Sequence, residues 1–236
     1  QRPPAAGAGA SLVMRIKALH RKALRDLWHM RGQAMAIAMV IASGIAMLVM
    51  SAATLASLQD TRDRLYRDYR FSHLWAQVKR APEAIAHRVA ELPGVNEVET
   101  RLIASAKVEL PGFGEPIEAV VQSLPDQGEP AQNRLYLRSG RMLAPYADDE
   151  VLVSESFARA QHLKPGDRLR ATVYGRTQWF TIVGLALSPE YVYQIKPGAM
   201  FPDYQRYAIL WMGRRALEAA LDMSGAFNQV VVRLSP

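Results

Sequence analysis

The sequence of 236 residues contains no cysteine, which excludes disulfide-stapled scaffolds, thiolate metal sites and cysteine nucleophiles. It also lacks GxSxG, HExxH, GxxxxGK[ST] and GxGxxG, the patterns that accompany common hydrolase, zinc, nucleotide and dinucleotide chemistry. Its five histidines are scattered, and its densest acidic run, Asp148 to Glu150, has three consecutive acids, a spacing that rarely converges on one ion. We therefore expect a protein that is not an enzyme, with no cofactor, no metal and no catalytic residues.

Positive charge in excess is confined to one end of the chain. The formal net charge is +7, and residues 1–31 hold seven Lys or Arg against one acid, while the other residues hold 22 basic and 21 acidic side chains. A nearly neutral bulk offers no basic field to phosphates, so nucleic acid is not an expected partner. Half of the residues are apolar, which excludes general disorder and is enough for a real core.

One long apolar run indicates a membrane protein. Residues 34–58 contain no charge and would form about 37 Å of helix, enough to cross a bilayer with some tilt. The run is too long for the apolar core of a cleaved signal peptide, and a buried helix of a soluble protein rarely stays uncharged for so long. Because the basic cluster precedes the run, the positive-inside rule predicts a cytoplasmic N-terminus and a main domain outside the cytoplasmic membrane. The small residues around Gly44 would either admit a second helix or simply be tolerated in an anchor.

The segments that flank the span have their own patterns. Residues 1–13 are of low complexity, and we expect them to be disordered. Residues 14–33 read as a basic amphipathic helix on the cytoplasmic membrane surface, either a simple electrostatic anchor or a docking element. Residues 59–70 alternate in charge sign, as a solvated helical stalk would. The candidate contacts of the amphipathic helix with a partner or with the membrane are Arg15, Lys17, Arg21, Lys22, Arg25 and Trp28.

Residues 71–236 predict one α+β domain. A strand over 71–80 is followed by a helix that we expect to begin at Pro82, and residues 95–110 and 117–124 read as two further strands. Gly166 supplies the positive φ of a type II turn, and Ser154 is a candidate helix cap. The later expected elements are strands at 150–154, 168–174, 177–187, 207–212 and 228–234, and helices after 154 and at 214–223.

An aromatic-rich run, residues 191–211, is the best candidate in this domain for a contact surface with another protein. We expect an extracytoplasmic interaction surface made by Glu190, Tyr191, Tyr193 and Trp211. Glu190 has no second carboxylate at a recognisable distance in sequence, so a general-acid role for it is not favoured.

Several short motifs follow one another in a characteristic order along the chain. They are Leu92-Pro93-Gly94-Val95, Ser139-Gly140-Arg141, Glu150-Val151-Leu152-Val153-Ser154, Leu163-Lys164-Pro165-Gly166-Asp167, the run from Val183 to Tyr193, Leu210-Trp211-Met212 and Phe227-Asn228. With the basic helix and the single span before them, their order over residues 14–236 resembles the N-terminal part of FtsX-like and MacB-like ABC transporter permeases. The resemblance implies a first transmembrane helix followed by a mixed α/β domain like the MacB periplasmic core domain.

The resemblance also implies partners and a location. Such a permease sits in the bacterial inner membrane, pairs with a separate ABC ATPase subunit and with a second permease copy or a related one, and works with a periplasmic adaptor or membrane fusion protein. It couples ATP hydrolysis to movement of its periplasmic domain, for export or for release of lipids or lipoproteins. Three further spans follow the external domain in that family, so the chain is expected to be a fragment. The alternative is a single-pass, membrane-anchored binding or sensor domain.

Overall fold

The structure, a computed structural model, describes residues 22, 25 and 28–235. The described chain divides into two units, one ending at Arg62 and the other beginning at Asp63. The candidate contacts Arg15, Lys17 and Arg21 lie outside the described residues.

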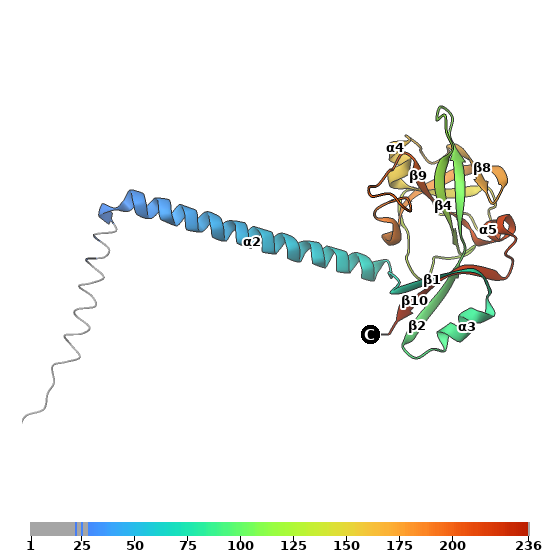
Figure 1. The fold of residues 1–236 in the computed structure, drawn as a ribbon, viewed down its shortest axis with the longest axis horizontal. Coiled ribbons are helices and arrows are strands. Elements are labelled where there is room, and N and C mark those ends of the chain that lie inside the picture. The colour runs from blue at the N-terminus through green and yellow to red at the C-terminus, as the bar shows by residue number, and fades with distance from the viewer. Residues whose placement is uncertain (1–21, 23–24, 26–27, 236) are drawn as a thin grey trace, which may run out of the picture. The chain divides into compact units, whose positions relative to one another are not determined.

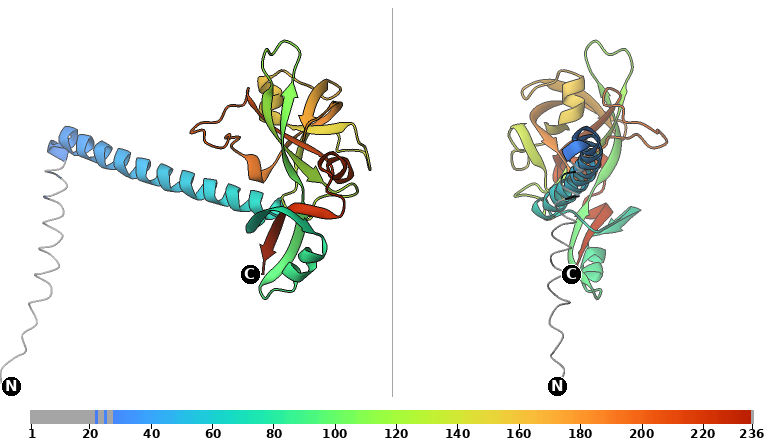
Figure 2. Two further views of the ribbon diagram at one scale, coloured as in Figure 1. Left: turned by 45° about the vertical axis from the view of Figure 1, so that its right-hand side comes forward. Right: turned by 90° about the vertical axis from the view of Figure 1, so that its left-hand side faces the viewer.

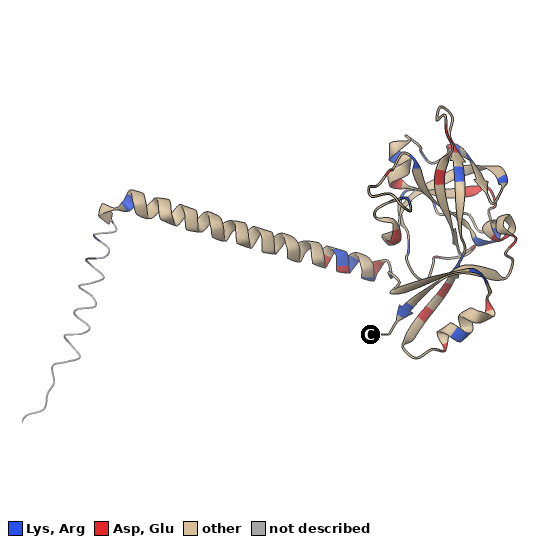
Figure 3. Cartoon of the chain, viewed as in Figure 1, with Lys and Arg blue, Asp and Glu red and all other residues tan. Residues whose placement is uncertain are grey.

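Helix α2, Arg31–Asp68, contains the apolar run and is the one described helix long and apolar enough to cross a membrane. None of its residues is buried, and Met39, Val40 and Leu48 are 64%, 72% and 72% exposed. Figure 3 shows that its charged residues lie at its two ends. The hydroxyl of Ser43 donates to the Val40 carbonyl and that of Thr61 to the Ser57 carbonyl, each at 2.8 Å. These two hydroxyls are satisfied within the helix, which presents apolar side chains outward as a membrane span requires.

The second unit contains two sheets (Figure 1). The smaller has the antiparallel order β1-β10-β2 and comprises β1 (Leu74–Pro82), β10 (Ala226–Leu234) and β2 (Val95–Arg101). The short helix α3, Ala84–Ala90, packs against it. Figures 1 and 2 show this sheet and α3 together on one side of the unit.

The larger sheet has seven strands in the order β5-β8-β6-β9-β4-β3-β7, and it closes because β7 also pairs with β8. The long strand β8 makes this possible, because its first half pairs with β7 and its second half with β5 and β6. The bounds are β3 Ile103–Glu109, β4 Ile117–Leu124, β5 Tyr136–Gly140, β6 Glu150–Ser154, β7 Arg168–Val173, β8 Arg176–Leu187 and β9 Tyr207–Gly213. Helices α4 (Glu155–Ala160) and α5 (Arg214–Leu221) follow β6 and β9, and the 3₁₀ turn η1 (Pro189–Tyr191) follows β8.

The core explains why these segments are strands. Every residue of β9 is buried, which accounts for its unbroken apolar run. One cluster of buried side chains includes Phe157, Leu169, Ile182 and Leu217, and a second surrounds Trp211 and Ile209. The predicted α+β class is confirmed: helices pack on sheets, the smaller sheet is antiparallel, and the larger one also contains the parallel pairs β4–β9 and β6–β8.

Two local expectations are wrong. Pro82 does not begin a helix: it ends β1, opposite Ala226, and α3 starts two residues later. The expected strand over residues 95–110 is two strands in different sheets, divided at Leu102. Leu102 is fully buried, and its N–H donates to the Ser123 hydroxyl at 2.9 Å while its carbonyl accepts from the Ser123 N–H at 2.8 Å. These two bonds fix the crossover, and nothing in the local apolar pattern of the segment marks it.

Two glycines of the quoted motifs are required by close packing. Gly140 and Gly184 face each other across β5 and β8. A Cβ on Gly184 would lie 2.5 Å from the Arg141 carbonyl oxygen, and one on Gly140, whose φ is +82°, would meet the Val183 carbonyl oxygen. Only glycine lets the two backbones approach this closely.

Candidate functional site at the junction of the two sheets

The junction between the sheets centres on η1. Pro189 occupies the first position of this turn, and the Ser188 hydroxyl accepts from the Glu190 N–H at 3.2 Å. The turn has two sides. Pro189 and Val192 line an apolar groove, whereas Glu190 and Tyr191 line a second, mixed cavity.

A buried ion pair joins the sheets through Glu190. Both terminal nitrogens of Arg101, the last residue of β2, donate to the two Glu190 carboxylate oxygens at 2.7 Å. Arg101 is 4% exposed, and the Glu190 side chain is 16% exposed. Gln122 on β4 also donates to Glu190, at 3.3 Å. The carboxylate is therefore held from the small sheet and from the large one, in a setting where breaking a pair costs more than at the surface.

Tyr191 packs beside this pair. Its ring meets that of Trp211 edge to face, with centroids 6.3 Å apart. Burial, and then the negative charge of Glu190, raise the pKa of the Tyr191 phenol far above its usual value. The Tyr191 phenol is therefore protonated at neutral pH, and its ring packs on Trp211.

The mixed cavity, which we call the junction cavity, has a volume of about 330 Å³. Gln77 and Gln229 line its small-sheet wall and are register partners on β1 and β10. Arg101 on β2, the register partner of Gln229, continues this row behind the wall and holds the lining residue Glu190. Gln229 is 6% exposed, and its Oε1 has no hydrogen-bond partner. The Arg101 Nε and the Gln122 Oε1 are likewise buried without a partner. The lining residues are Phe71, Trp75, Gln77, Ile103, Val120, Glu190, Tyr191, Pro197, Tyr207 and Gln229.

The last residues of α2, from Asp63 onward, belong to the second unit and are held within it by a clamp. The Phe71 N–H donates to the Tyr66 carbonyl at 2.9 Å and the Arg70 N–H to the Arg67 carbonyl at 3.2 Å, with Arg70 at a φ of +50°. This is a Schellman cap, and the stacked rings of Tyr66 and Phe71, 4.5 Å apart, supply its apolar contact. The Arg70 guanidinium reaches Glu97 on β2 at 2.9 Å.

Asn133 completes the clamp. Its backbone N–H donates to the Arg70 carbonyl at 3.0 Å, and its side-chain oxygen accepts from the Ser72 N–H at 2.8 Å. Its side-chain nitrogen donates to the Ser72 hydroxyl at 2.9 Å. Asn133 and Ser72 are 3% and 1% exposed, and the φ of Asn133, +50°, is one that asparagine tolerates. The neighbouring Gln132 N–H donates to Glu99 at 2.7 Å, so the same loop also holds β2.

The apolar groove lies beside this clamp and has a volume of about 370 Å³. Tyr69 and Tyr136, which both line it, meet edge to face at 6.2 Å. The groove thus joins the last turns of α2 to η1. Its other lining residues are Leu65, Leu187, Ser188, Pro189 and Val192.

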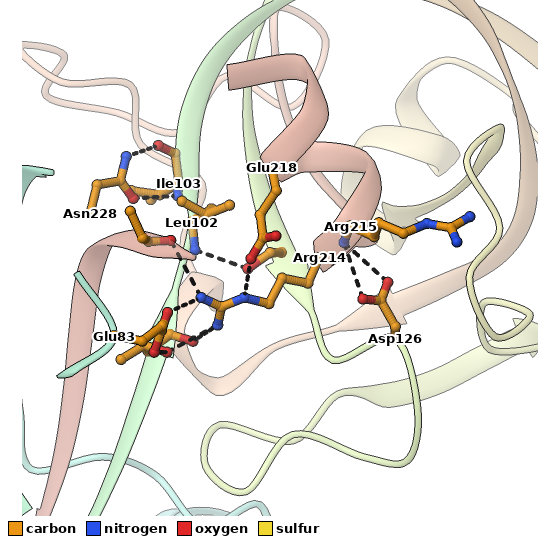
Figure 4. Close-up of polar contacts among 11 residues, drawn as sticks. Glu83, Leu102, Ile103, Asp126, Arg214, Arg215, Glu218 and Asn228 are labelled. Carbon is orange, nitrogen blue, oxygen red and sulfur yellow. Dashed lines mark hydrogen bonds and ion pairs between the residues drawn. The ribbon is translucent and has the colours of Figure 1, made fainter. Parts of the chain in front are cut away.

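A second polar cluster ties the sheets together at α5 (Figure 4). The Arg214 side chain forms ion pairs with Glu218 at 2.8 Å and with Glu83, and donates to the Thr100 carbonyl at 2.8 Å. Asn228 exchanges two hydrogen bonds with the backbone of Ile103, at 2.8 and 2.7 Å. The sheets are therefore crosslinked by side chains at two separate places.

The predicted interaction surface is only partly exposed. Tyr193 is 71% exposed, but Glu190 faces Arg101 and Tyr191 is mostly enclosed. Trp211 is 1% exposed, so its assignment to a surface was wrong: it lies on β9, which is covered on both faces. Near the N-terminus, Lys22, Arg25 and Trp28 are described, and Trp28 is 75% exposed.

The acidic run is bound by arginines. Arg141 holds Glu150 through two hydrogen bonds of 2.8 and 2.5 Å, and this contact lowers the pKa of the Glu150 carboxyl. Asp148 pairs with Arg215 at 3.2 Å. Among the described residues, no group of three His, Cys, Asp or Glu side chains is placed to hold a metal ion.

Sequence reasoning missed the residues that build the junction. Arg101, Asn133 and Gln229 belong to none of the quoted motifs, and their roles arise from strand register and loop geometry. A signal was available only for Asn133, because asparagine is one of the few residues that favour a positive φ.

No protein-family model and no curated protein matches this sequence. Among solved structures, the chain is similar to the extracellular domain of the noncanonic ABC-type transporter YknZ from Gram-positive bacteria, at 12% identity and a TM-score of 0.40, over 66% of this chain and 74% of that one. It is similar to the periplasmic region of MacB from Actinobacillus actinomycetemcomitans at 14% identity and a TM-score of 0.40, over 69% and 67%. It is also similar to a domain of a protein described as a permease from Porphyromonas gingivalis, at 18% identity and a TM-score of 0.39, over 67% and 70%.

Proposed function

We propose that the chain is the N-terminal part of the permease subunit of an ABC transporter of the FtsX and MacB type. The observation that carries the proposal is the order of three features along the chain. A basic N-terminal segment comes first, then a helix with a long uncharged stretch in which no side chain is buried, and then an α+β domain. The basic segment favours a cytoplasmic N-terminus in the bacterial inner membrane, with the domain outside. The role proposed is not enzymatic.

The clamp and the junction suggest how such a domain would respond to its span. We propose that an ATPase partner displaces the cytoplasmic end of α2 and that the other end passes the displacement to the clamp at Asn133. From there two routes lead into the domain: the Arg70–Glu97 pair and the Gln132–Glu99 bond lead into the small sheet, and the groove leads to η1. The Arg101–Glu190 pair would then set how the two sheets move together.

A single-pass anchored binding domain is the second candidate. The junction cavity favours it, because a nearly buried amide oxygen without a partner is a place for a ligand. The permease candidate includes export or the release of lipids or lipoproteins, a periplasmic adaptor and a permease dimer. The anchored binding domain would have none of these.

The test is co-purification from membranes of the native host, using the full chain with a C-terminal affinity tag and mild detergent. The proposal predicts a stoichiometric ABC ATPase subunit that is lost when Lys22 and Arg25 are both changed to glutamate. The matched control makes equivalent charge changes in the domain, at Lys164 and Arg138, and should keep the ATPase. A tagged chain that purifies without any ATPase, in detergents that preserve other ABC complexes, would contradict the proposal.

A further inference from the structure

Strand β1 has an open edge. Its strand neighbour is β10, and no other described strand pairs with it. Its outward N–H and C=O groups are therefore available to a further strand. Lys79, Arg80 and Pro82, residue types that discourage strand addition, stand only at its C-terminal end. The stretch Leu74–Gln77 carries no such protection, and Leu74 and Trp75 are 53% and 62% exposed.

The junction cavity lies beside this open stretch, since Trp75 and Gln77 of β1 form part of its wall. The cavity carries little net charge, because the Arg101 guanidinium neutralises the Glu190 carboxylate through two bonds of 2.7 Å. Among the lining residues, Gln229, which is 6% exposed, has a buried Oε1 without a hydrogen-bond partner. An occupant that satisfies this wall is neutral and bears a hydrogen-bond donor. Trp75 and Tyr207 add aromatic surface to the cavity wall.

We propose that the open edge of β1 and the junction cavity together bind an extended peptide segment of a partner protein. The segment adds a strand along Leu74–Gln77 and inserts one neutral, donor-bearing side chain toward Gln229. An acidic residue beyond that side chain then reaches Lys79 and Arg80, neither of which forms an ion pair with a described residue.

The open edge and the charges decide between occupants. A saccharide could use the aromatic walls and Gln229 but has no main chain to pair with the strand edge. A second copy of this chain would bring its own Lys79 and Arg80 to the edge, not the acidic residues that complement them. The proposal needs no ATPase, so it stands or falls separately from the proposed function.

The test uses the full chain in detergent micelles and a capped, fluorescently labelled octapeptide of alternating valine and asparagine that ends in two aspartates. Binding is measured by fluorescence anisotropy. The main-chain control is the same octapeptide with alternate backbone nitrogens methylated, which keeps the side chains and removes donors. The proposal predicts binding of the first peptide and at least about tenfold weaker binding of the second.

Two variants place the peptide on β1. Trp75→Ala should weaken binding, whereas Trp179→Ala, which removes an aromatic side chain 48% exposed on β8, should not. Arg80→Glu should weaken the aspartate peptide about three- to tenfold and strengthen a peptide ending in two lysines. The matched charge reversal Lys164→Glu, in the turn before β7, should leave the affinities for both peptides unchanged.

Three results would overturn the proposal. They are no binding of the octapeptide up to millimolar concentration, equal binding of the methylated peptide, or the same affinity for the Trp75→Ala chain. Binding of maltopentaose that depends on Trp75, with no peptide binding, would make the cavity a carbohydrate site instead.

Discussion

Breaking the Arg101–Glu190 pair is expected to destabilise the domain more than breaking any exposed ion pair. In Glu190→Gln the guanidinium of Arg101, 4% exposed, loses its counter-charge and one of two hydrogen bonds of 2.7 Å. Removing one partner of a buried pair costs about 3–5 kcal/mol. Glutamine keeps one acceptor and the Glu190 side chain is 16% exposed, so we expect a loss of about 2–3 kcal/mol in the free energy of unfolding.

The assay is urea unfolding of the full chain in micelles, followed by tryptophan fluorescence. Trp211, 1% exposed and 6.3 Å from the Tyr191 ring, should report loss of the junction strongly. Glu118→Gln is the matched control: it breaks the exposed pair with Lys196, and we expect it to cost less than about 1 kcal/mol.

A double variant tests the reasoning further. Arg101→Leu with Glu190→Leu removes both charges, and its stability should lie closer to that of the native chain than either single variant does. The reasoning would be refuted if Glu190→Gln cost no more than Glu118→Gln, or if the double variant lost as much as the two single variants together.

Three further predictions concern the clamp, the strand packing and pH. Asn133→Ala removes two hydrogen bonds to Ser72 and puts alanine at a φ of +50°, so it should cost about 2–4 kcal/mol; Asn133→Gly, which accepts that φ, should cost less, and equal losses in urea unfolding would rule out the backbone term. Gly184→Ala should cost about 1–3 kcal/mol because its methyl meets the Arg141 carbonyl oxygen, whereas Gly114→Ala, with open space, should be nearly neutral; similar melting temperatures would contradict this. Burial raises the pKa of the Glu99 carboxyl in the folded chain. The folded chain therefore loses stability as the pH rises from the unfolded pKa through the folded pKa of this group. Glu99→Gln should therefore stabilise the chain at neutral pH and lose this gain below the unfolded pKa; a gain that is the same at every pH would show that charge is not the cause.

The elements were predictable where a local rule decides them. The charge-free run of α2 and the buried run of β9 are readable directly, because burial or a membrane demands apolar side chains throughout. The turn at Gly166, with a φ of +98°, follows from the proline and glycine that form it.

The junction was not predictable, because long-range register makes it. Gln77, Gln229 and Arg101 are far apart in sequence and meet only because β10 lies between β1 and β2. Glu190 was selected from the sequence, but its partner Arg101, 89 positions away, was not. Trp211 was misplaced because aromatic residues are frequent both in cores and in interfaces, and composition alone does not separate the two.

Cysteine labelling across the membrane tests the central claim most directly, since the native chain has no cysteine and each variant carries a single one. Tyr174→Cys replaces a side chain 74% exposed on the domain, Ser11→Cys marks the N-terminal segment, and Ser43→Cys marks the apolar run as an unreactive control. In spheroplasts, a membrane-impermeant maleimide should label the Tyr174→Cys chain at once and the Ser11→Cys chain only after permeabilisation. Labelling of Ser11→Cys in intact spheroplasts with Tyr174→Cys protected would contradict a cytoplasmic N-terminus and an external domain.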